Sequence, residues 1–191
     1  MTNTEHTDIR PLFSTAASTA AKVLAGVTPA QYGDPTPCDD FTVRQLMDHL
    51  VGATRRLAVV GRGGDAESVD PSSPLEEWNL AFSEAVSDVE EAWGDPARLG
   101  QTVVLPFAEL PGAAAVALYT NEVTVHSWDL AGATGQSVDW DPAVLAVSLS
   151  AMKQMLPPGA RPEEIPFADE VAVPGDAPAI DQLVAWSGRR P

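Results

Sequence analysis

Residues 41–57 read FTVRQLMDHLVGATRRL and carry the best-marked helix start in the chain. Thr42 and Gln45 have the spacing of a capping box, in which each side chain satisfies a free backbone N–H of the first turn. Apolar residues then recur every three or four positions, which predicts a helix with one buried face. His49 falls on that face, three residues after Leu46, so the sequence places an imidazole in the core.

A second stretch, ALYTNEVTVHSWDLA at residues 117–131, carries two more polar residues toward the interior. Glu122 and His126 are four residues apart, so on a helix they share one face. A carboxylate pointed into a core costs several kcal/mol unless a partner neutralises it. A metal ion, a salt bridge to Arg55 or Arg56, and a His–Glu hydrogen bond would each do so, and the spacing alone leaves all three open.

The metal hypothesis joins His49, Glu122 and His126 in one site built from two helices. Two imidazoles and one carboxylate suit Zn²⁺ and leave a coordination position open, although Ni²⁺, Fe²⁺ or Mn²⁺ would fit the same ligands. We rank zinc first. Asp129, three residues after His126, could orient an imidazole, but a solvated carboxylate or a pair with an arginine explains it at least as well.

The remaining pattern predicts an all-α protein. TVVLPFAELPG, residues 102–112, predicts a small β-hairpin across one end of a bundle, and EVAVP, residues 170–174, one further strand. We therefore expect an α-helical bundle with a hairpin and a short C-terminal appendage. The other expected helices cover residues 8–25, 71–93, 112–131, 141–156 and 180–188, with Trp78, Trp93, Trp128 and Tyr119 in the core.

Composition fits one globular domain over residues 1–191, of which 45% are hydrophobic. The formal charge of −16, from 27 acidic and 11 basic residues, argues against nucleic acid or an anionic membrane as partner, since each needs a basic surface. We see neither a signal peptide nor an apolar run of about 18 residues. Together with a single cysteine, these features predict a cytoplasmic protein.

Two further residues could carry chemistry but have simpler interpretations. Cys38 is the lone cysteine and precedes the helix that carries His49. It could become reactive near that helix start, but a packed small residue is the favoured interpretation. His6 lies in a polar N-terminal stretch, and we expect it to be a solvated bystander.

Three stretches together resemble a known group of actinobacterial proteins: PTPCDDFTVRQLMDHLVG (35–52), TNEVTVHSWDLAGATGQ (120–136) and IDQLVAWSGRRP (180–191). The group shares the N-terminal domain of mycothiol-dependent maleylpyruvate isomerase, within the DinB-like superfamily. The similarity extends from about residue 8 to about residue 190. It implies a four-helix bundle with a divalent metal held by His, Glu and His, which match His49, Glu122 and His126.

The resemblance also implies an activity. In the family, the metal presents a metal-bound water or the thiolate of a low-molecular-weight thiol, here mycothiol, and the thiolate adds to a small electrophilic substrate. We therefore expect a mycothiol-dependent S-transferase or cis–trans isomerase. The isomerase uses an arginine on the second long helix, whereas residues 74–93 contain neither Arg nor Lys.

Two hypotheses of other classes remain beside the enzyme. One is a non-catalytic metal-binding sensor or interaction module. The other is a purely structural bundle in which Glu122 belongs to a buried ion pair. A homodimer through an exposed bundle face is common for such folds, and we keep it as an expectation.

Overall fold

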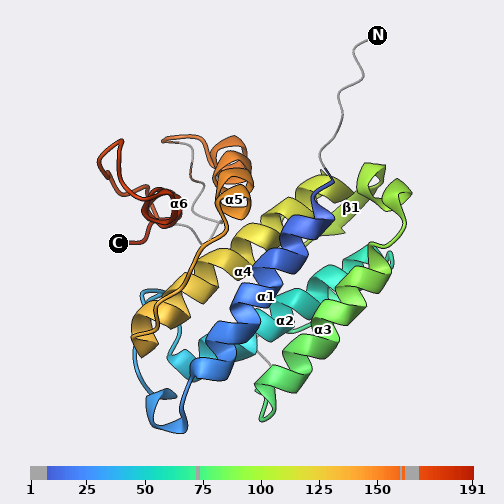
Figure 1. Ribbon diagram of the computed structural model, residues 1–191. Helices are drawn as coiled ribbons and strands as arrows, with labels where there is room; N and C mark the ends of the chain where they lie inside the picture. The colour runs from blue at the N-terminus through green and yellow to red at the C-terminus, as the bar shows by residue number, and fades with distance from the viewer. Residues whose placement is uncertain (1–7, 72–73, 160, 162–167) are drawn as a thin grey trace.

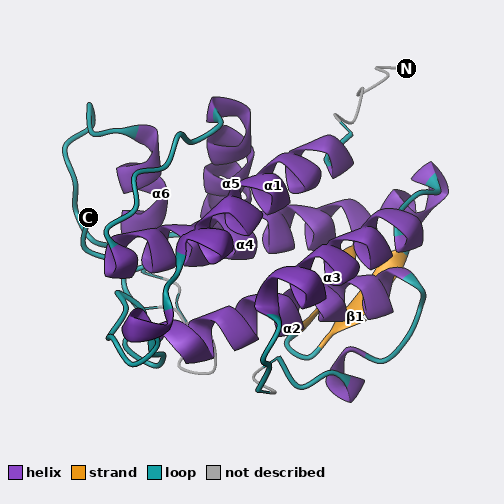
Figure 2. Cartoon of the chain, turned by 60° about the horizontal axis from the view of Figure 1, so that its bottom comes forward, coloured by secondary structure: helices purple, strands orange, loops and turns teal. Residues whose placement is uncertain are grey.

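The computed structural model describes residues 8–71, 74–159, 161 and 168–191. Four long helices lie alongside one another in Figure 1: α1 (Arg10–Gly26), α2 (Val43–Gly61), α3 (Trp78–Ala92) and α4 (Gly112–Thr134). Two shorter helices, α5 (Pro142–Met155) and α6 (Ala179–Trp186), stand to one side of α4 (Figure 2). The fold is therefore the expected all-α bundle with a C-terminal appendage.

The start of α2 is the predicted capping box. The Thr42 hydroxyl accepts a hydrogen bond from the Gln45 N–H at 3.4 Å, and the Thr42 N–H donates to Gln45 Oε1 at 3.0 Å. The buried stripe of the helix also follows the prediction, with Leu46, Leu50 and Leu57 fully buried. This capped start sets the rotation of α2 and thereby turns His49 toward the bundle interior.

Helix α4 is the central element, because it packs against α1, α2 and α5. Most of its residues are buried, including the polar side chains of Thr120, Asn121 and Ser127. One core lies among α1 to α4, and a second, smaller core joins Val125 of α4 to Leu183 of α6 and to α5. Side chains of α4 therefore contact both the bundle and the appendage.

The predicted hairpin is confirmed. Strand β1 (Thr102–Leu105) pairs antiparallel with β2 (Ala108–Pro111), and the register sets Thr102 opposite Pro111. The hairpin contacts α2 and α4 at one end of the bundle, where Leu105 is buried (Figure 1). Within the described residues, no helix has the length and apolar character needed to cross a membrane.

Helix α3 begins at Trp78, later than the predicted start near residue 71. The buried carboxylate of Asp48 accepts hydrogen bonds from the Leu75 N–H at 2.9 Å and from Trp78 Nε1 at 2.7 Å. These bonds hold the chain before Trp78 outside the helix. The sequence near residue 75 does not predict them, because Asp48 lies on another helix. Residues 72–73 lie outside the described part of the chain.

The strand predicted at residues 170–174 is wrong. These residues carry no strand assignment, and the Val171 N–H instead donates to the Ala185 carbonyl at 2.9 Å. β-branched residues favour extended backbone, but a strand needs a second strand to pair with, and here the neighbour is a helix. The short last helix was predicted correctly and is α6. His6 lies outside the described residues.

We expect Gly52→Ala to lower the free energy of unfolding by about 1–3 kcal/mol. A Cβ at Gly52 would lie 2.5 Å from the carbonyl oxygen of Pro71, a backbone atom that cannot move aside cheaply. The matched control is Gly132→Ala in α4, where the nearest atom is Pro37 Cγ at 3.7 Å. That change should stabilise by up to about 1 kcal/mol, because alanine favours helix. Urea denaturation of both variants tests the opposite signs, and equal effects would contradict the close approach.

Candidate metal centre

The three predicted residues meet between α2 and α4. The Nε2 atom of His49 lies 2.9 Å from Glu122 Oε1, and the Nε2 atom of His126 lies 3.3 Å from the same oxygen. The two imidazole rings meet edge to face, with centroids 5.0 Å apart. The side chains of His49, Glu122 and His126 are 16%, 23% and 7% exposed, so the cluster is largely shielded from solvent.

This arrangement fits a divalent metal ion. The ligand atoms of the three side chains all lie within 4.8 Å of one another. Ligands held about 2.0–2.1 Å from a tetrahedral zinc ion stand about 3.3 Å apart, close to the separations found here. Both rings also turn the same nitrogen, Nε2, toward one carboxylate oxygen. The residues could therefore close on a metal with little movement of the helices.

The cluster is also electrostatically balanced without a metal. Burial alone would raise the pKa of Glu122, but the charge of His126 and hydrogen bonds from His126 and His49 hold it well below its usual range. Burial alone would lower the pKa of His126, but Glu122 and Asp129 raise it to about 9. In the metal-free protein His126 is therefore protonated near neutral pH, and a metal must displace that proton.

Asp129 combines two of the roles considered for it. Its side chain is fully buried, so the solvated alternative is wrong. Its Oδ2 atom accepts a hydrogen bond from His126 Nδ1 at 3.0 Å. The same carboxylate is paired with Arg189, whose Nη2 lies 3.0 Å from Oδ2. A carboxylate behind a histidine in this way fixes which ring nitrogen carries the proton and leaves Nε2 facing Glu122.

Phe41 holds the other imidazole. Its ring stacks on His49 with centroids 4.9 Å apart and planes 30° apart. The Nδ1 atom of His49 is buried and has no hydrogen-bond partner in the described chain. The His49 ring is therefore oriented by aromatic stacking and by Glu122, whereas the His126 ring is oriented by a carboxylate on each nitrogen.

Cys38 forms a second possible ligand set together with His126 and Asp129. Its sulfur, an imidazole nitrogen of His126 and a carboxylate oxygen of Asp129 lie within 4.8 Å of one another. Burial raises the pKa of the half-buried Cys38 thiol, although Arg189 opposes the shift. This set shares His126 with the first and needs the carboxylate that Arg189 already holds. The His49, Glu122 and His126 set is therefore the better candidate.

Tyr119 lies next to the cluster, and Arg56 lies near Tyr119. The sequence offers Arg56 as a salt-bridge partner of Glu122 but does not connect Tyr119 with the cluster. Tyr119 is buried, and burial raises its pKa, so the phenol stays neutral. Arg56 donates from Nε and Nη2 to the carbonyls of Ala66 and Val69, at 3.0 and 2.8 Å. The ion pairs of Glu122 in the described chain join it to the two histidines instead. Tyr119 could have been found from its position, three residues before Glu122.

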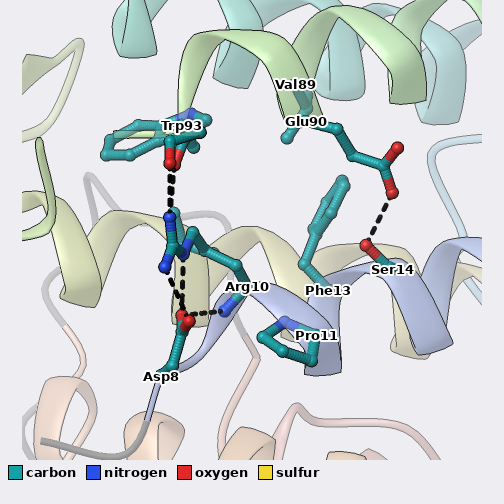
Figure 3. A pocket seen from close by; sticks show the side chains of 10 residues that line it. Asp8, Arg10, Pro11, Phe13, Ser14, Val89, Glu90 and Trp93 are labelled. Atoms are coloured by element: carbon teal, nitrogen blue, oxygen red, sulfur yellow. Dashed lines mark hydrogen bonds and ion pairs between the residues drawn. The ribbon is translucent and has the colours of Figure 1, made fainter. Parts of the chain in front are cut away.

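A cavity of about 310 Å³ lies elsewhere, between the start of α1 and the end of α3 (Figure 3). Its lining includes none of the three cluster residues. Arg10 pairs with Asp8 and donates to the carbonyls of Trp93 and Gly94, and Ser14 donates to Glu90. These polar groups already bond to one another or to backbone carbonyls. The cavity therefore offers a ligand few free polar groups.

Fold and cluster together define a helical-bundle protein with two histidines and one glutamate facing one another between two of its long helices. The chain belongs to the mycothiol maleylpyruvate isomerase N-terminal domain family, which its residues 13–131 match. All three cluster residues lie inside that range, as the resemblance seen in the sequence implies.

Two curated relatives are uncharacterized proteins of Mycobacterium tuberculosis, from strains CDC 1551 and H37Rv. Each is 37% identical to this chain over 169 residues, which cover 88% of this chain and 91% of the relative. No solved structure matches the chain.

Proposed function

We propose that the protein binds a divalent metal ion, zinc first, through His49, Glu122 and His126 and acts as a mycothiol-dependent S-transferase or isomerase on a small electrophile. The observation that carries the proposal is that these three side chains lie together, although His49 is 73 residues before Glu122 in the sequence. All three belong to the part of the chain that matches the family. A metal ion bound there would lower the pKa of a coordinated thiol or water.

The chain's own residues prepare the site for such an ion. Glu122 supplies negative charge between the two imidazoles. Asp129 holds the Nδ1 proton of His126, so Nε2 is the nitrogen left for a ligand. Phe41 limits rotation of the His49 ring by stacking on it. These contacts hold the donor set in place beforehand, which reduces the ordering cost of binding.

Tyr119 adds a neutral hydrogen-bond donor beside the cluster. Burial and the charge of Glu122 both raise the pKa of its phenol. A neutral O–H in a buried setting can donate to a developing negative charge on a substrate without itself bringing charge into the site. Arg56 of α2 supplies positive charge near Tyr119, whereas α3 contains neither Arg nor Lys.

The test is metal analysis followed by thiol assays. Protein purified without chelator is analysed by plasma mass spectrometry, stripped, and titrated with zinc. The zinc-loaded protein is then mixed with mycothiol and a small electrophile, such as an α,β-unsaturated acid or a haloalkane, and loss of free thiol and product isomer are followed. Zinc uptake with metal-dependent turnover supports the proposal.

The other outcomes separate the competing functions. Zinc uptake without any thiol reaction would favour the metal-binding sensor or interaction module. Failure to take up zinc, nickel, iron or manganese would contradict the metal proposal. It would favour the structural hypothesis, in which the cluster is a buried ion pair.

A further inference from the structure

The carboxylate behind His126 is held by the end of the chain. Asp129 is fully buried, and two donors reach its oxygens: His126 Nδ1 from the same helix, and the guanidinium of Arg189 from 60 residues downstream. Arg189 donates from Nη2 to Oδ2 at 3.0 Å and from Nε to Oδ1 at 3.3 Å. This two-point contact fixes the plane of the carboxylate as well as its position.

The segment that carries Arg189 is itself firmly seated. Leu183 and Val184 of α6 are fully buried, and the Arg189 N–H donates to the Val184 carbonyl at 2.9 Å. Gly188 turns the chain with φ of +86°, a conformation that glycine adopts at little cost. The side chain of Arg189 is only 10% exposed, and its Nη1 donates to the Ser187 carbonyl at 3.0 Å. The guanidinium is thus aimed at Asp129 by local structure.

We infer that Arg189 is a positioning residue for the metal centre: it clamps Asp129, and Asp129 in turn holds the imidazole of His126 with Nε2 toward Glu122. The inference rests on the proposed metal-binding function. It adds that the centre depends on a residue outside the part of the chain, residues 13–131, that matches the family. Through this contact the C-terminal appendage, besides packing on α4, contributes a residue that positions the metal ligand His126.

The physical reason lies in the cost of a buried carboxylate with too few partners. Without the guanidinium, Asp129 would keep a buried negative charge with one hydrogen bond, and it could rotate to seek others. The His126 ring would then lose its fixed orientation. Partners of this kind behind a ligand histidine contribute about 10–100-fold to metal affinity.

The experiment measures zinc affinity of full-length protein by competition with a chromophoric chelator. The variants are Arg189→Gln, which removes the charge, and Arg189→Lys, which keeps the charge but loses the two-point contact. The control is Arg161→Gln. Arg161 anchors the same segment by donating to the Ala168 and Trp186 carbonyls, and in the described part of the chain its polar partners do not include Asp129. Circular dichroism confirms that each variant is folded.

We expect Arg189→Gln to weaken zinc binding about 10–100-fold. Arg189→Lys should weaken it less, and Arg161→Gln should stay within about twofold of the wild type, because only an indirect contact is changed. In the metal-free protein, proton NMR of the His126 Nδ1–H should show faster exchange with water in Arg189→Gln but not in Arg161→Gln, because the hydrogen bond to Asp129 is no longer held in place. If the Gln variant is poorly folded, the folded Lys variant carries the test, and weaker zinc binding by Arg189→Lys than by Arg161→Gln supports the contact with Asp129.

Two results would overturn the inference alone: wild-type affinity in Arg189→Gln, or an equal loss in Arg161→Gln, which would mean that the segment only stabilises the fold. A wild-type protein that binds no zinc would overturn the proposed function and the inference together. The two failures are therefore distinguishable.

Discussion

We expect Glu122→Gln to lower the affinity of the proposed site for zinc by at least about 100-fold, because a neutral amide oxygen replaces the only charged ligand of the cluster. His49→Ala and His126→Ala, which each remove an imidazole donor, should reduce affinity by a similar or larger factor. Competition with a chelator of known affinity measures all three. These three losses of affinity are the largest expected for any single substitution, since each variant lacks one of the three ligands.

The matched control is Glu90→Gln. Glu90 is also a helical glutamate in a hydrogen bond, here accepting from Ser14 at 2.7 Å, but it lines the remote cavity of Figure 3. Its substitution should leave zinc affinity unchanged. Wild-type affinity in Glu122→Gln would rule out this carboxylate as a ligand and would favour the set that contains Cys38.

Rising pH should affect the metal-free protein and metal binding in opposite directions. The pKa of His126 is about 9 in the folded protein, against 6.5 as its ordinary value. A raised folded pKa contributes stability that is fully present below pH 6.5 and is lost as pH rises through 9. At about 1.4 kcal/mol per unit, the metal-free protein should lose roughly 3 kcal/mol over that window. Zinc affinity should instead rise up to about tenfold per unit, as the competing proton leaves.

Denaturant midpoints between pH 6 and 9.5 test the first trend, and chelator competition over the same range tests the second. The control is His126→Gln, and the difference between the wild-type and variant stability curves removes the contribution of other titrating groups. On the acid side, the depressed pKa of Glu122 contributes stability above its ordinary 4.5, which is lost as pH falls through the folded value. A flat difference curve from pH 6.5 to 9 would contradict the ion-paired state of His126.

The candidate site was largely predictable because its signals are local. The capping box at Thr42 sets where α2 begins, and helical spacing then places His49 on the inner face. The spacing of Glu122 and His126 puts both on one side of α4. Periodicity encodes which face is buried, so three polar residues on buried faces are visible from the sequence alone.

Contacts between distant segments were not predictable. Asp48 delays the start of α3 through bonds to Leu75 and Trp78. Residues 170–174 lie outside any sheet because no described residues form a strand beside them. Stacking of Phe41 on His49 depends on how the loop before α2 folds back. None of these contacts has a signature in the spacing of nearby residues.

By itself, then, the sequence determined that this protein is a helical bundle and that His49, Glu122 and His126 lie on inner faces. Both follow from hydrophobic periodicity and capping, which act within a few residues. Only the tertiary structure decided that His126 is held from behind by Asp129 and that Asp129 is held by Arg189. That pairing depends on where α6 packs against the rest of the protein, and packing between segments 60 residues apart is settled by the whole core rather than by any local stretch.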